Sequence, residues 1–238
     1  LAGYYPGHRL SYNLVLFTGE DSLVHGVSIK LEKLITQQGL HCQVIRRFNK
    51  YGEFPVSTER TSMPHKHERR FNAAPNRLRT RERIALLEVD RVVSLVMENL
   101  EAASVLDIGT GTGIFAQAFD AGGLAVTGID ANPAYLQEAN NYAPGAAFKA
   151  GTAEALPFDS NTFDLCFLGH VLHETDDPID ALREARRVSR LRVAVLEWPY
   201  REEQYGPPLN HRLSQDAIRS MAGQAGLGAV EHLRLAHM

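Results

Sequence analysis

A glycine-rich turn between a short apolar run and a helix constrains the fold of this chain more than any other feature. Residues 105–109 read Val-Leu-Asp-Ile-Gly, and glycines then occupy alternate positions up to Gly113. A second apolar run, residues 125–129, ends at Asp130. Because a buried strand, a tight turn, a helix and a second strand together make a βαβ unit, this stretch predicts a parallel sheet covered by helices.

The same turn predicts a nucleoside-binding site. The missing side chains at Gly109, Gly111 and Gly113 permit a sharp turn and let a ligand lie against bare backbone. The carboxylate of Asp130 is placed to accept hydrogen bonds from ribose hydroxyls. Residues from Gly111 to Ala116 also fit the dinucleotide fingerprint G-x-G-x-x-A, so the glycines alone leave the nucleoside open.

Asp107 separates the two kinds of cofactor. A carboxylate at the mouth of the turn would repel the pyrophosphate of a dinucleotide, which the helix N-terminus would otherwise attract. S-adenosylmethionine has no phosphate and carries a sulfonium and an ammonium group, so an acid beside the turn is favourable. We therefore expect S-adenosylmethionine as the cofactor, with an acidic strand end that binds no ligand as the alternative.

With these motifs, residues 63 to 238 resemble the class I S-adenosylmethionine-dependent methyltransferases. Residues 151–158, Gly-Thr-Ala-Glu-Ala-Leu-Pro-Phe, are similar to the adenine-side loop of that family, and residues 159–167 to its fourth strand. The branch it resembles includes the ubiquinone and menaquinone biosynthesis methyltransferases. The resemblance implies a doubly wound, mainly parallel, Rossmann-like α/β sheet with helices on both faces. It also implies methyl transfer to a small-molecule acceptor.

The motifs and the resemblance together indicate a set of cofactor-binding residues. These are Asp107, Gly109, Thr110, Gly111, Gly113, Asp130, Ala131, Thr152, Ala153 and Leu156.

Two positions depart from the family pattern. Thr152 stands where the family most often has Asp, so a hydroxyl replaces the carboxylate that meets the adenine amino group. Residues 229–235 fit the sixth strand of the family, and no residues follow for its antiparallel seventh strand. We expect that strand either to be supplied from elsewhere or to lie outside this sequence.

Candidate residues for the acceptor side follow the fourth and fifth strands, because ligands of open parallel sheets bind beyond the carboxyl ends of the strands. His173 is the first candidate for a general base and His170 the second; simple packing of both histidines stays open. Trp198 and Tyr200 are candidate walls for a planar substrate, and His211 lies in a proline-rich loop that is placed to line the same pocket. We expect no metal site, since no third ligand has a suitable spacing.

The domain organisation has three parts. Residues 1–60 lie outside the resemblance and read as a strand over 12–17, a helix and a strand over 42–48. Such a βαβ appendage cannot bury its own sheet, so it is expected to dock on the main domain or on another subunit, which leaves a homo-oligomer open. Residues 61–100 form a basic connector and a helix from about 81 to 100, and residues 101–238 form the methyltransferase domain.

The connector is rich in arginine. Its excess charge suits an anionic substrate or nucleic acid, but only Phe71 interleaves for base stacking and the whole chain has a net charge of -3. A solvated connector and a small-molecule partner are therefore expected instead of nucleic acid. The basic residues are Arg60, Lys66, Arg69, Arg70, Arg77, Arg79, Arg81 and Arg83.

Composition places the chain among globular proteins. Hydrophobic residues make up 44% and charged residues 22%, which is sufficient for a full core. Cys42 and Cys166 are far apart, and the apolar run 14–17 is too short to cross a membrane. We expect a reduced cytoplasmic protein without a membrane segment.

Two other classes of function stay open beside the methyltransferase. A non-catalytic binding or regulatory module would keep the nucleoside site while Thr152 and the missing strand reduce activity. A nicotinamide oxidoreductase would use the same glycine turn, but the carboxylate of Asp107 argues against it.

Overall fold

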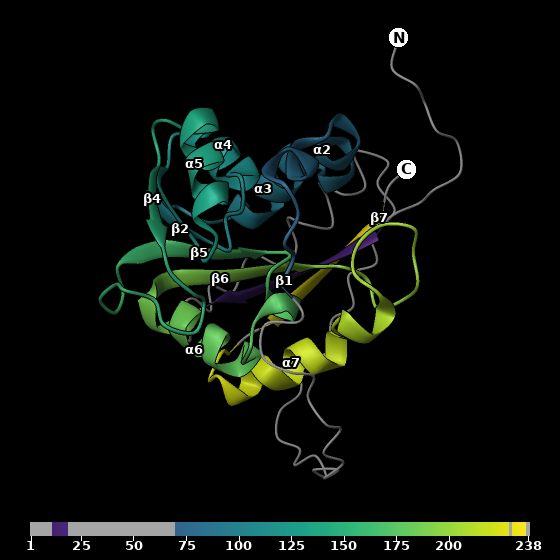
Figure 1. Ribbon diagram of the computed structural model, residues 1–238. Coiled ribbons are helices and arrows are strands. Elements are labelled where there is room, and N and C mark those ends of the chain that lie inside the picture. Colours follow the sequence, from purple (N-terminus) through teal and green to yellow (C-terminus); the bar gives the residue numbers. More distant parts are fainter. Residues whose placement is uncertain (1–10, 19–69, 229, 237–238) are drawn as a thin grey trace, which may run out of the picture.

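The computed structural model describes residues 11–18, 70–228 and 230–236 (Figure 1). In this part of the chain one open sheet has the strand order β4-β3-β2-β5-β6-β1-β7. The strands β4, β3, β2, β5 and β6 are parallel to one another. The strand β1 is antiparallel to both of its neighbours, β6 and β7. The strands are β1 Ser11–Thr18, β2 Ser104–Ile108, β3 Ala125–Asp130, β4 Ala147–Ala150, β5 Phe163–Gly169, β6 Ser189–Glu197 and β7 Val230–Ala236.

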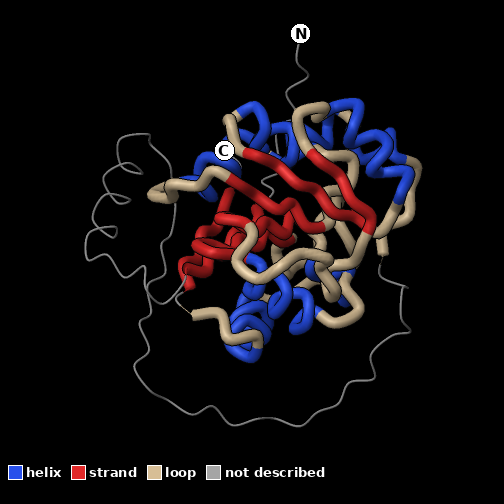
Figure 2. Tube along the Cα trace, turned by 90° about the vertical axis from the view of Figure 1, so that its left-hand side faces the viewer, coloured by secondary structure: helices blue, strands red, loops and turns tan. Residues whose placement is uncertain are grey.

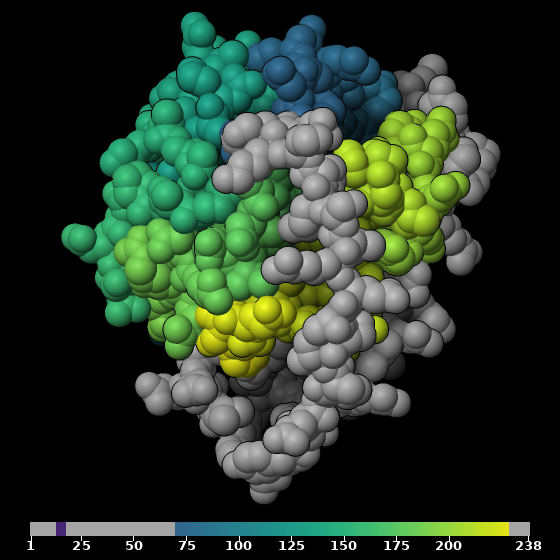
Figure 3. Space-filling view, turned by 60° about the horizontal axis from the view of Figure 1, so that its bottom comes forward, coloured from purple at the N-terminus to yellow at the C-terminus, as the bar shows by residue number. Residues whose placement is uncertain are grey.

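Helices cover both faces of the sheet, as the sequence predicts for a doubly wound α/β fold (Figures 1 and 2). The helices α2 to α5 lie over one face, and α6 and α7 lie over the other; the yellow surface in Figure 3 is that of α7. The helices are α2 Arg81–Leu87, α3 Val89–Met97, α4 Ile114–Ala121, α5 Pro133–Tyr142, α6 Pro178–Val188 and α7 Gln215–Gln224. Short 3₁₀ turns are η2 Pro75–Arg79, η3 Leu172–Glu174 and η4 Leu209–His211.

The central strands are buried on both faces, which explains their nearly unbroken apolar sequences. In β5, Leu165 and Phe167 pack into the cluster beneath α3 and α4. Cys166 and Leu168, the alternate residues, pack into the cluster that contains the apolar faces of α6 and α7. The fold therefore has two cores, one on each side of the sheet.

Residues 11–18 correct the prediction of a separate N-terminal appendage. The strand β1 lies inside the main sheet between β6 and β7, with Val15 opposite Val195 on one side and His232 on the other. Its apolar segment from 14 to 17 is almost fully buried. The amino-terminal strand thus supplies the antiparallel strand between β6 and β7. The rest of the predicted βαβ unit lies outside the described residues.

The helix predicted from about 81 to 100 is also wrong as one continuous element. Glu88 has a left-handed backbone conformation, with φ 43° and ψ 47°, and separates α2 from α3. Five residues differ by about 140° around a straight helix, so Leu87 and Val92 would face different directions. The break allows both side chains to enter the core, where their exposed fractions are 3% and 0%.

The two acids before α6 have different roles. Asp177 caps the helix, because its Oδ1 accepts hydrogen bonds from the backbone N–H groups of Ile179 and Asp180. Asp176, the residue before it, instead pairs with Arg70 at 3.2 Å. The helix ends at Val188, and β6 begins at the next residue without an intervening loop.

Candidate functional site

A cavity of about 480 Å³ lies at the carboxyl ends of β2, β5 and β6. Its walls come from the glycine turn, the turn after β5, the loop after β6 and the connector segment 70–87. This is the edge of the sheet where open parallel folds bind ligands. The sequence-predicted residues that line it are Asp107, Gly109, Thr110, Gly111, Asp130, His170, His173, Trp198 and His211.

The other predicted site residues do not line this cavity. Tyr200 is 56% exposed and is not part of the lining, and its contact with a substrate stays a prediction. Gly113 serves the packing of α4 on α5, since an added Cβ would lie 3.0 Å from Ala139. Ala131, Thr152, Ala153 and Leu156 also lie outside the lining, and their contact with adenine stays a prediction.

The glycine turn is closely packed. Gly109 has φ of 70°, and a Cβ added there would lie 2.3 Å from the side chain of Val171. The backbone N–H groups of Gly109 and Thr110 donate to the carbonyl of Ile129 at 2.8 and 3.0 Å, which ties the turn to β3. Gly111 has φ of 55° and faces the cavity. Glycine at 109 is therefore required by both conformation and space.

Two carboxylates meet at the turn. Asp107 is buried and accepts a hydrogen bond from Thr110 Oγ1 at 2.7 Å; burial raises the pKa of its carboxyl group to about 7, with a further contribution from Asp130. Asp130 accepts hydrogen bonds from the backbone N–H groups of Gly111 and Asn132 at 2.9 and 2.8 Å. Burial also raises the pKa of Asp130.

These groups fit a cationic nucleoside better than an anionic one. A buried carboxylate with a raised pKa is stabilised by a cation placed beside it. The carboxylate oxygens of Asp130 are held by backbone donors and retain lone pairs for ribose hydroxyls. Asp107 and Asp130 therefore suit the ammonium, the sulfonium and the ribose of S-adenosylmethionine, and would oppose a pyrophosphate.

His173 lies in η3 and meets an acid that the sequence analysis did not single out. Its Nδ1 is 2.8 Å from Glu197 Oε2, and its backbone N–H donates to Glu197 Oε1 at 3.1 Å. On the other side of the ring, Nε2 lies 3.7 Å from Glu174 Oε1. Burial by itself would lower the pKa of His173, but the carboxylates of Glu197 and Glu174 outweigh it, and the pKa is raised.

His170 has a different environment. Its backbone is left-handed, with φ of 58°, and its ring lies 4.7 Å from the ring of Trp198. Burial lowers the pKa of His170 well below its usual value, and the charges of Arg83 and His173 add to this effect. The surroundings of His170 thus favour its neutral ring, whereas those of His173 favour its protonated ring.

The connector covers the cavity. The backbone N–H of Phe71 donates to Glu174 Oε2 at 3.1 Å, and Arg70 pairs with Asp176. Arg79 donates from Nε and Nη2 to the carbonyl of Thr112 at 3.1 and 2.8 Å. These contacts attach the segment to the turn after β5 and to the glycine turn.

Sequence reasoning missed Glu174 and Glu197. Glu197 is the last residue of β6, directly before Trp198, so the strand-end rule that selected Trp198 applied to it equally. Glu174 follows His173 directly. The sequence does not show that Glu197 is buried. Its carboxylate is 0% exposed, and a buried carboxylate needs hydrogen-bond donors around it.

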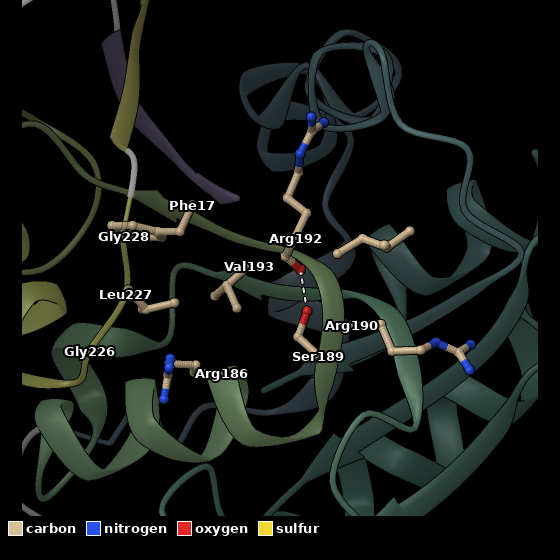
Figure 4. Close-up of a pocket in the computed structure, with 10 residues that line it drawn as sticks. Phe17, Arg186, Ser189, Arg190, Arg192, Val193, Gly226, Leu227 and Gly228 are labelled. Carbon is tan, nitrogen blue, oxygen red and sulfur yellow. Dashed lines mark hydrogen bonds between the residues drawn. The ribbon is translucent and has the colours of Figure 1, made fainter. Parts of the chain in front are cut away.

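A second, smaller cavity of about 80 Å³ lies at the opposite end of the sheet, between the end of α6 and the start of β6 (Figure 4). Ser189 Oγ donates to the carbonyl of Arg192 there at 2.8 Å. The Arg192 guanidinium donates instead to the carbonyls of Val96 and Glu98, so it is directed away from this cavity. Its volume is far too small for a nucleoside.

Within the described ranges, no helix has the length and apolar character needed to cross a membrane. The same residues contain no cluster of three or more His, Cys, Asp or Glu side chains arranged to hold a metal ion.

Comparison with known proteins shows which family the central part of the chain resembles. Residues 106–192 match the family model for a methyltransferase domain. A malonyl-[acyl-carrier protein] O-methyltransferase from Erwinia pyrifoliae is 36% identical over 138 residues, 53% of this chain and 53% of that protein. A demethylmenaquinone methyltransferase from Renibacterium salmoninarum is 31% identical over 103 residues, 43% of this chain and 44% of that protein. The chain thus spans about half the length of these relatives.

The fold has a solved counterpart in a SAM-dependent methyltransferase from Aquifex aeolicus. The TM-score is 0.58 at 21% identity, covering 69% of this chain and 97% of that one. At this identity the likeness establishes the fold. The family model thus matches the central part of the chain, from β2 to β6, and the doubly wound fold is that of a solved methyltransferase.

Proposed function

We propose that this protein transfers a methyl group from S-adenosylmethionine to a small-molecule acceptor. One observation carries the proposal: a single cavity joins the carboxylates of Asp107 and Asp130 at the glycine turn to His173 beyond β5. The matched methyltransferase domain supports the reaction type.

The cofactor site uses the glycine turn. Asp130 holds the ribose hydroxyls, and Asp107 offsets the positive charge of the cofactor. When bound, S-adenosylmethionine supplies an electrophilic methyl group: a lone pair of the acceptor forms the new bond to carbon while the carbon–sulfur pair stays on sulfur.

The chain's own residues enclose the reaction and move a proton. Phe71, Leu78 and Leu87 form an apolar wall of the cavity on the connector side, and Trp198 lines it beyond β6. Holding two reactants in one geometry contributes roughly 7–11 kcal/mol to catalysis. His173 takes a proton from the acceptor where the acceptor carries one, and His211 lines the acceptor pocket.

A small molecule is the acceptor that we favour over nucleic acid. Arg70 and Arg79, two of the arginines from which a nucleic-acid surface would be built, bind Asp176 and Thr112 within the fold.

The cytoplasm is the proposed location, since Cys166 is a buried free thiol whose pKa is raised by burial. A homo-oligomer formed through the amino-terminal residues stays a proposal. The strand β1 does not support it, because β1 pairs with β6 of its own chain.

The test separates cofactor from activity. Thermal unfolding is measured with S-adenosylmethionine and with NAD in separate samples, and methyl transfer is then measured over a panel of small phenols, amines and acids. We expect stabilisation by S-adenosylmethionine alone and turnover of at least one acceptor. Stabilisation by NAD alone would contradict the proposal, and binding without any turnover would favour a non-catalytic module.

A further inference from the structure

Glu197 occupies the most enclosed position of any acid in the described part of the site. Its exposed fraction is 0%, and it ends β6 beside the turn that carries His173. Its oxygens accept from the backbone N–H of His173 at 3.1 Å and from the backbone N–H of Trp198 at 3.3 Å. These two donors anchor the carboxylate, so its position does not depend on the histidine ring.

The anchored carboxylate determines which ring nitrogen of His173 carries the proton. An ionised carboxylate only accepts hydrogen bonds, so the 2.8 Å contact requires Nδ1 of His173 to be the donor to Glu197 Oε2. In the neutral ring the lone pair is then on Nε2, beside Glu174. His173 and Glu174 both line the cavity.

We propose that Glu197 is a positioning residue that fixes His173 as the proton acceptor, and that the methyl acceptor is a weakly acidic hydroxyl on an aromatic ring. This inference rests on the proposed function. The proton of the hydroxyl moves to Nε2 of His173, the O–H pair stays on oxygen, and that oxygen attacks the methyl carbon. The imidazolium that results lies between the carboxylates of Glu197 and Glu174.

The charges around His173 favour this class of acceptor. Glu197 and Glu174 stabilise the imidazolium, whereas Arg212 opposes it, as does burial. The cation Arg83 lies on the His170 side of the cavity. A carboxylate acceptor has no proton to lose at neutral pH, and Glu174 would repel it. A phenol, with a pKa of about 10, needs a base and is close enough to histidine for transfer.

The cavity walls fit an aromatic ring. Phe71, Phe115 and Trp198 line the cavity together with Pro207 and Pro208. Flat apolar side chains of this kind bury a ring at low entropic cost and leave its hydroxyl to be placed by polar groups.

The first experiment needs neither cofactor nor acceptor. The ¹⁵N chemical shifts of the His173 ring are followed with pH in the full chain, and the signal is assigned from its loss in His173→Gln. We expect the neutral ring to carry its proton on Nδ1. In Glu197→Gln, a mixture of tautomers and a lower pKa of His173 are expected.

Asp164→Asn is the matched control, because Asp164 also accepts two backbone N–H groups, from Ala103 and Ser104, but lies at the other end of the sheet. It should leave the His173 signals unchanged. A neutral ring protonated on Nε2 in the unsubstituted protein overturns the proposal, and this measurement stands even if Glu197→Gln does not fold.

The second experiment uses turnover. With a phenol acceptor, Glu197→Gln should lower kcat about 10- to 100-fold, part of the about 100- to 10,000-fold that general base catalysis contributes, and change KM little. The acid limb of its pH profile should move to lower pH, and Glu197→Asp should restore part of the rate. Methylation of carboxylic acids but not of phenols overturns the acceptor class. Absence of all methyl transfer refutes the proposed function, while the ring tautomer still decides the role of Glu197.

Discussion

Replacing Asp107 by Asn should stabilise the protein and weaken its cofactor site. Burial raises the pKa of Asp107 to about 7, with Asp130 adding to the effect and the Thr110 hydrogen bond opposing it. Because the folded state holds the proton more tightly than the unfolded chain, the ionised carboxylate costs stability. This cost is absent below about pH 4, grows as pH rises and is complete above the folded pKa.

The magnitude follows from the two pKa values. Each unit of pKa corresponds to about 1.4 kcal/mol, so the cost should grow by roughly 2–3 kcal/mol between pH 5 and pH 8. Asn cannot ionise and retains an oxygen to accept from Thr110 Oγ1. We therefore expect the advantage of Asp107→Asn in unfolding free energy to be larger at pH 8 than at pH 5 by about that amount.

Urea unfolding at the two pH values measures the difference, and calorimetry with S-adenosylmethionine measures the loss of affinity. Asp164→Asn is a control of opposite sign. Burial opposes the ionisation of Asp164, but donors from Ala103, Ser104 and Arg190 lower its pKa, so its replacement should cost stability at neutral pH. If the unfolding free energy gained by Asp107→Asn is the same at pH 5 and pH 8, the reasoning is refuted that the buried Asp107 carboxylate is destabilised until a cation binds beside it.

Three further substitutions test the turn and the sheet. Asp130→Ala should weaken S-adenosylmethionine binding by about 1.5–3 kcal/mol with folding retained, and unchanged affinity in calorimetry would remove this carboxylate from the site. Gly109→Ala should cost about 1–2 kcal/mol from its left-handed backbone, with the clash against Val171 added; Val171→Ala in the same chain should relieve only the part of the clash made by the two γ-methyl groups, because the Cβ of residue 171 stays 2.7 Å away. Leu14→Ala should cost about 2–5 kcal/mol in urea unfolding, because the side chain is fully buried; a loss below about 0.5 kcal/mol would mean that β1 is only an appendage.

The parts of the fold that the sequence predicts well are those encoded locally. The glycine turn and the apolar run of β5 each depend on neighbouring residues, and both are present. The strand-end rule also brought His173 and Trp198 into one cavity, because the carboxyl ends of β5 and β6 lie side by side.

The parts that were missed depend on contacts distant in sequence or on weak patterns. The strand β4, Ala147–Ala150, is a mostly exposed edge with no apolar run to signal it. The helix break at Glu88 has no glycine that would predict it from the sequence. It is explained by the packing of Leu87 and Val92 into the core. In the sequence, Glu197 is indistinguishable from an exposed charged residue at the end of a strand. Only the structure shows that it is buried against His173.

The placement of β1 links the amino-terminal residues to the candidate site. In the antiparallel register Asn13 lies opposite Glu197, the residue that holds the His173 ring. Asn13 is buried, and its Oδ1 accepts from Gln215 Nε2 at 3.1 Å, which joins β1 to the start of α7. Without β1, the edge of β6 would lose its ladder of backbone hydrogen bonds next to Glu197, and β7 would lose its connection to the sheet. Residues that lie outside the matched domain in sequence therefore support the strand on which the proposed proton transfer depends.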